Sequence, residues 1–102
     1  MKITNKVLLL KLAFRSLFDQ RAEAHQMFTE AIYEFQDEIA EYFEAHLPEH
    51  NKTYGMGVIT ELKDITEQIF KNPDSPKRQE LTECLGKLSI AAHFIPKDQQ
   101  DL

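Results

Sequence analysis

Residues 28–46 read FTEAIYEFQDEIAEYFEAH, and this stretch decides the fold. Its large apolar residues recur at intervals of four, three, four and three positions, at Phe28, Ile32, Phe35, Ile39 and Tyr42. This spacing places them on one face of an α-helix, which completes a turn in about 3.6 residues. No glycine or proline occurs between Met1 and Leu47. The stretch therefore predicts a long amphipathic helix.

The same apolar spacing recurs on both sides of this stretch. One stripe precedes it, at Ile3, Val7, Leu10, Phe14 and Leu17, and two follow it, at Val58, Leu62, Ile65 and Ile69 and at Leu81, Cys84, Leu85, Leu88, Ala92 and Ile95. A single helix over residues 5–46 would be about 60 Å long, which exceeds a compact domain of this size. We therefore expect a break near residues 18–21, with Asp19 as a helix cap.

These stripes predict an all-α protein: a small, mostly antiparallel four-helix bundle in a single domain, residues 1–102. We expect helices at about residues 5–18, 20–46, 58–71 and 76–94. Residues 47–57 contain Pro48, Asn51 and two glycines and predict a polar connection. Ser75 followed by Pro76 predicts an N-cap and first helical position. The tail, residues 97–102, is expected to fray.

Composition excludes several classes of protein. The chain has 102 residues, 42% of them hydrophobic and 28% charged, which is typical of one soluble domain. Cys84 is the only cysteine, so an intrachain disulfide and a zinc site with several thiolates are both impossible. No run approaches the ~18 apolar residues of a membrane span. We expect a cytoplasmic protein that does not bind membranes.

Charge is distributed unevenly along the chain. Residues 1–21 carry a net charge of +4, residues 22–51 carry −8 without a single Lys or Arg, and residues 52–102 carry −1. The cations of residues 1–21 are not expected to share one helical face, so we predict no direct binding of nucleic acid through them.

Five acids of the second predicted helix repeat the spacing of its apolar stripe. They are Glu30, Glu34, Asp37, Glu41 and Glu44, which we call the acidic ridge. Each lies two positions after an apolar stripe residue, or about 200° around the helix, so the ridge should face away from the core. Two interpretations stay open: a solvated face, or a docking surface for a cationic partner. Tyr33 beside the ridge is a candidate anchor, because tyrosine is enriched in binding hot spots.

Two further acidic pairs suggest a different chemistry. Glu38-x-x-Glu41 and Glu61-x-x-Asp64 resemble the paired carboxylates of the all-α nucleoside triphosphate pyrophosphohydrolases of the MazG type. The resemblance covers these four positions and implies a metal-dependent enzyme in which they hold magnesium. This is our alternative hypothesis for function.

No catalytic motif supports an enzyme beyond that resemblance. The sequence contains no glycine-rich phosphate loop, no dinucleotide fingerprint and no nucleophile with a suitably spaced base. We therefore expect a small acidic non-catalytic binding protein, of the inhibitor or immunity type, that masks a basic protein, one that could act on nucleic acid. A third hypothesis is a self-assembling structural protein, a homodimer formed through surplus leucines of the first helix, Leu8, Leu9 and Leu12.

Overall fold

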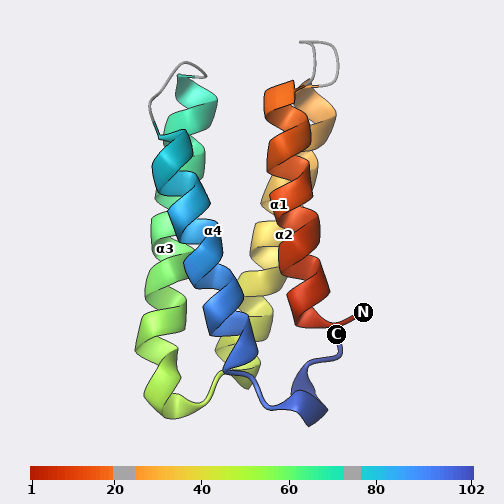
Figure 1. The fold of residues 1–102 in the computed structure, drawn as a ribbon, viewed down its shortest axis with the longest axis vertical. Helices are drawn as coiled ribbons and strands as arrows, with labels where there is room; N and C mark the ends of the chain where they lie inside the picture. Colours follow the sequence, from red (N-terminus) through yellow and green to blue (C-terminus); the bar gives the residue numbers. More distant parts are fainter. Residues whose placement is uncertain (20–24, 73–76) are drawn as a thin grey trace.

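The computed structural model describes residues 1–19, 25–72 and 77–102, and these form a four-helix bundle. The helices are α1 (Ile3–Asp19), α2 (His25–His46), α3 (Glu49–Lys71) and α4 (Arg78–His93), followed by a short 3-10 turn, η2 (Lys97–Gln99). Successive helices run in opposite directions (Figure 1), and α1 and α3 each pack against both α2 and α4. The predicted all-α antiparallel architecture is confirmed.

The core is built from the predicted stripes of α1, α3 and α4, whose residues are buried. In α2 the buried face differs by about one residue from the prediction. It consists of Ile32, Gln36, Ile39 and Phe43, while Phe28, Phe35 and Tyr42 are only partly buried. Gln36 is accommodated because its Nε2 donates a hydrogen bond to Thr66 Oγ1 at 2.7 Å, which offsets part of the cost of burying an amide.

The prediction of a polar connection over residues 47–57 was wrong, because α3 begins at Glu49 rather than near residue 58. Pro48 occupies the N-cap position, where a backbone N–H would have no partner within the helix, so proline loses no hydrogen bond there. The Asn51 amide donates to the Pro48 carbonyl at 2.9 Å. Gly55 is buried against Leu47. Pro48 therefore precedes the first residue of α3 and Gly55 lies inside the helix, so neither residue marks a loop here.

The expectation of a frayed tail was also wrong. The Ile3 amide donates to the Gln100 carbonyl at 2.7 Å, and the Leu102 amide donates to the Met1 carbonyl at 2.8 Å. The Tyr42 hydroxyl donates to the Asp101 carbonyl at 2.8 Å and also contacts that of Gln99. These bonds hold the C-terminal segment against α2 and the start of α1, where both chain ends lie (Figure 1).

Some predicted features fall outside the described residues. Asp19, the predicted helix cap, is the last residue of α1, and the residues between it and His25, where α2 begins, are outside the described ranges. The remainder of the predicted break, residues 20–21, and the predicted cap Ser75 with Pro76 lie outside the described ranges. Among the described helices, none combines the length and the apolar character needed to cross a membrane.

Candidate functional site

The acidic ridge lies on the outer face of α2. Its five residues are all exposed, whereas Ile32 and Ile39 on the opposite face are fully buried. The orientation follows from the helical period, because each ridge residue is two positions from an apolar residue that packs into the bundle. The result is a row of carboxylates along a packed helix.

The protein neutralises little of this charge itself. Lys63 on α3 lies with its Nζ 3.7 Å from Asp37 Oδ1, and both side chains remain largely exposed. An exposed pair of this kind contributes about 0–1 kcal/mol. Within the described ranges no ion pair involves the other four ridge acids, and Glu30 accepts only a hydrogen bond from Gln26 at 3.3 Å. The ridge thus retains most of its negative charge.

Tyr33, the candidate anchor beside the ridge, is not a free side chain in the structure. It is half-buried, its hydroxyl donates to Glu67 Oε1 at 2.9 Å, and its ring lies 5.3 Å from that of Phe70. Burial, followed by the hydrogen bond and the negative charge of Glu67, raises the pKa of Tyr33 above its usual value. The Tyr33 side chain therefore links α2, which carries the ridge, to α3.

The structure does not bring together the four carboxylates of the pyrophosphohydrolase-like pattern. Glu38 forms an ion pair with Lys6 of α1, whereas Glu61 lies 3.7 Å from Lys87 of α4. Asp64 accepts a hydrogen bond from Gln68, and Glu41 lies on the exposed ridge. In the part of the chain described, no group of three or more His, Cys, Asp or Glu side chains is arranged to hold a metal ion.

Cys84 is buried as expected. Its side chain is fully enclosed, and the thiol lies 3.6 Å from the Val58 carbonyl oxygen. Burial raises the pKa of the Cys84 thiol to about 11; nearby Glu61 adds to the rise and Lys87 opposes it. The thiolate needed for nucleophilic attack is therefore scarce at neutral pH.

A cationic cluster between α1 and α4 was not predicted from the sequence. Lys11 and Arg15, one helical turn apart, line the same groove as Arg78. The sequence contains a sign of this groove, because Leu8 and Leu12 are four residues apart, as are Lys11 and Arg15. What the sequence could not show was that α4 lies alongside this face.

Compared with known proteins, the chain matches no family model, no curated protein and no solved structure.

Proposed function

We propose that this protein is a small, non-catalytic, cytoplasmic binding protein that masks a basic protein through the acidic ridge of α2. The observation that carries the proposal is that Glu30, Glu34, Glu41 and Glu44 are exposed and have no ion pair within the described chain. Of the five ridge acids, Asp37 is the one that forms an ion pair among the described residues, with Lys63.

The acidic ridge destabilises α2. This cost favours a role in binding over a role in solubility alone. Like charges three or four positions apart on a helix repel by about 0.2–0.5 kcal/mol per pair. Lysines or arginines of a partner would relieve this repulsion on docking. A row of one sign also steers an oppositely charged partner and raises the association rate at low salt.

The proposed mechanism is occlusion by a preformed surface. Tyr33 bonded to Glu67, and Glu38 bonded to Lys6, tie α2 to its neighbours on either side, so little ordering is needed on binding. A protein that acts on nucleic acid has a cationic binding site, which is complementary to the ridge. An inhibitor or immunity role against such a protein is the form of masking we propose.

The test compares two variants of equal charge. The ridge variant carries Glu34→Lys, Asp37→Lys and Glu41→Lys. The control variant carries Glu49→Lys, Asp64→Lys and Glu83→Lys, three exposed acids outside the ridge. Both change the net charge by the same amount. Circular dichroism verifies folding, and each immobilised protein is used to capture partners that mass spectrometry then identifies.

We expect the wild type and the control variant to retain the same basic protein and the ridge variant to lose it. Added salt should release the partner, because exposed charges are screened. Retention by the ridge variant, or equal loss from both variants, would contradict the proposal.

A further inference from the structure

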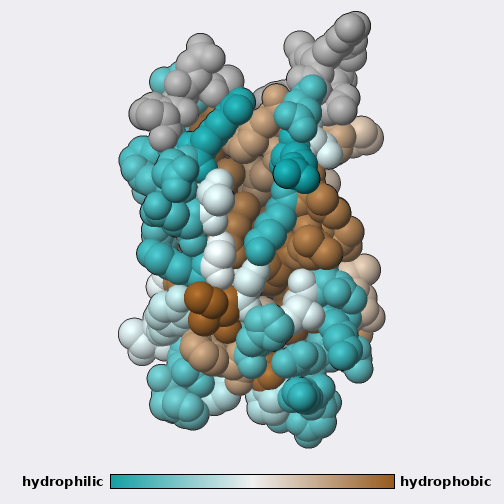
Figure 2. All heavy atoms as spheres, viewed as in Figure 1, coloured by the Kyte–Doolittle hydropathy of each residue, from teal (hydrophilic) through white to brown (hydrophobic). Residues whose placement is uncertain are grey.

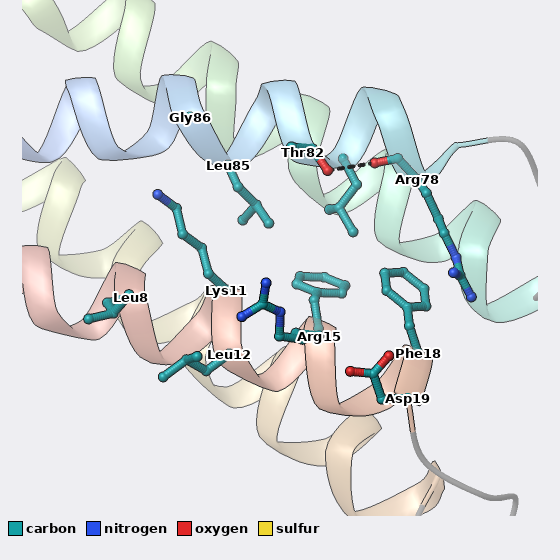
Figure 3. Close-up of a pocket in the computed structure, with 12 residues that line it drawn as sticks. Leu8, Lys11, Leu12, Arg15, Phe18, Asp19, Arg78, Thr82, Leu85 and Gly86 are labelled. Carbon is teal, nitrogen blue, oxygen red and sulfur yellow. Dashed lines mark hydrogen bonds between the residues drawn. The ribbon is translucent and has the colours of Figure 1, made fainter.

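A groove of about 680 Å³ runs between α1 and α4, away from the acidic ridge. Leu8 and Leu12 of α1 lie along one side, and Leu85 and Gly86 of α4 along the other (Figure 3). Leu8 is 52% exposed and Leu12 is 46% exposed, although both belong to a helix whose other face forms the core. Figure 2 shows apolar atoms at the surface between these two helices, bordered by hydrophilic side chains.

The border of the groove is cationic in an acidic protein. Lys11 and Arg15 project from α1, and Arg78 from α4 lies with its guanidinium 4.1 Å from the centroid of the Phe18 ring (Figure 3). Within the described chain Lys11 and Arg15 form no ion pair, and Asp19 is the one acid among the described residues that line the groove. The groove therefore combines exposed leucines with an excess of positive charge, three cations against one acid.

We propose that this groove binds an amphipathic helix of a second protein, one whose apolar face is bordered by Asp or Glu. Apolar grooves take up such helices through residues at i, i+3, i+4 and i+7. The distance along α1 from Leu8 to Phe18 is about 15 Å, which is close to three turns of a docked helix. The cations would pair with acids at the edges of that helix.

The charges argue against a second copy of this chain as the occupant. A twofold axis through α1 would place Lys11 and Arg15 opposite their own counterparts, and like charges would repel. The acidic face of α2 is also a poor ligand, because Met27 is the only large exposed apolar residue of that helix among those described. The dimer through Leu8, Leu9 and Leu12 is therefore not the occupant we propose.

Gly86 provides a way to close the groove without disturbing the core. A Cβ atom added at Gly86 meets no atom within 4 Å, so a larger side chain can extend into open space along the groove wall. Gly57 of α3 is equally open and does not line the groove. Gly86→Phe and Gly57→Phe are therefore matched substitutions, one that obstructs the groove and one that does not.

The experiment selects ligands from a displayed library of helical peptides. Each peptide carries leucine at i, i+3, i+4 and i+7, and its flanking positions vary between Glu and Lys. The library is selected on the wild type, Gly86→Phe, Gly57→Phe and the double variant Lys11→Glu/Arg15→Glu. Fluorescence anisotropy then gives the affinity of the best peptides.

We expect Glu-flanked peptides from the wild type and Gly57→Phe, at least tenfold weaker binding to Gly86→Phe, and a change to Lys flanks for Lys11→Glu/Arg15→Glu. Lys-flanked peptides from the wild type, unaltered affinity for a folded Gly86→Phe protein, or no enrichment would overturn the proposal. Binding of dodecanoate in the groove without peptide binding would also overturn it, in favour of a small anionic amphiphile. The ridge variant should bind the Glu-flanked peptides normally, so this test fails or succeeds independently of the proposed function.

Discussion

Lys63 Nζ lies 3.7 Å from Asp37 Oδ1, and within the described chain it is the one cation that forms an ion pair with the acidic ridge. Replacing it with methionine should expose the full charge of Asp37. We expect a basic partner to bind about two- to fivefold more tightly, the effect of one exposed charge pair. Lys87→Met is the control, because Lys87 pairs with Glu61 at the same distance, and the two lysines are similarly exposed, but the pair lies away from the ridge. Equal effects of both substitutions on affinity would contradict the assignment of the surface.

The buried contact between Gln36 and Thr66 should behave as a coupled pair. Thr66→Val removes the acceptor of the Gln36 amide and should cost about 1–3 kcal/mol of unfolding free energy. Gln36→Met should cost less, because Gln36 Oε1 is buried without a partner among the described residues and Thr66 still donates to the Leu62 carbonyl. Urea denaturation of the double variant completes the cycle. An equal cost of Thr66→Val in both backgrounds would show that the pair is not coupled.

The three glycines should respond differently to alanine. Gly57→Ala and Gly86→Ala should each stabilise the fold by about 0.5–1 kcal/mol, since alanine has the higher helix propensity and both sites are open. Gly55→Ala should destabilise it by about 1–3 kcal/mol, because the new Cβ would overlap the buried Leu47 side chain. Thermal denaturation gives the order of stability. A Gly55→Ala protein as stable as the other two would mean that Leu47 moves aside freely.

Cys84 should make the fold sensitive to alkaline pH. Folding raises the pKa of its thiol from 9.0 to about 11, so the folded state holds this proton more tightly than the unfolded state. The resulting stability is present below pH 9 and is lost as pH rises toward about 11, with a total on the order of 2–3 kcal/mol.

The Cys84→Ala variant should lack this part of the alkaline decline. The pKa values of Tyr33 and Tyr42 are also raised, but both tyrosines remain in the variant, so the difference between the two proteins isolates the thiol. Denaturant titrations from pH 8 to 11 measure it. Parallel curves for the two proteins would contradict the predicted linkage.

The helical period predicted what depends on local geometry. It gave the buried faces of α1, α3 and α4 and the outward position of the ridge, because a residue's direction on a helix follows from its spacing. It did not predict the burial of Gln36, which depends on Thr66 thirty positions away. A polar residue can be buried when a distant partner satisfies it, and a single stretch of sequence does not contain that information.

The remaining errors have the same origin. The conformational preferences of proline and glycine indicated a loop at Pro48 and Gly55. In the structure Leu47 packs over Gly55, and the helix starts directly after the proline. The tail is polar and predicts fraying, but hydrogen bonds to Ile3 and Tyr42, which are distant in the sequence, hold it in place. The groove likewise exists only because α1 and α4 come together.

The most direct test of the central claim is to map the bound surface by NMR. Isotope-labelled wild-type protein is titrated with the basic protein that it captures, and the shifts of the backbone amides are followed. We predict the largest changes along α2 from Glu30 to Glu44, with the residues around Leu12 and Gly86 unaffected. Changes concentrated between α1 and α4, with α2 unperturbed, would show that the acidic ridge is not where the partner binds.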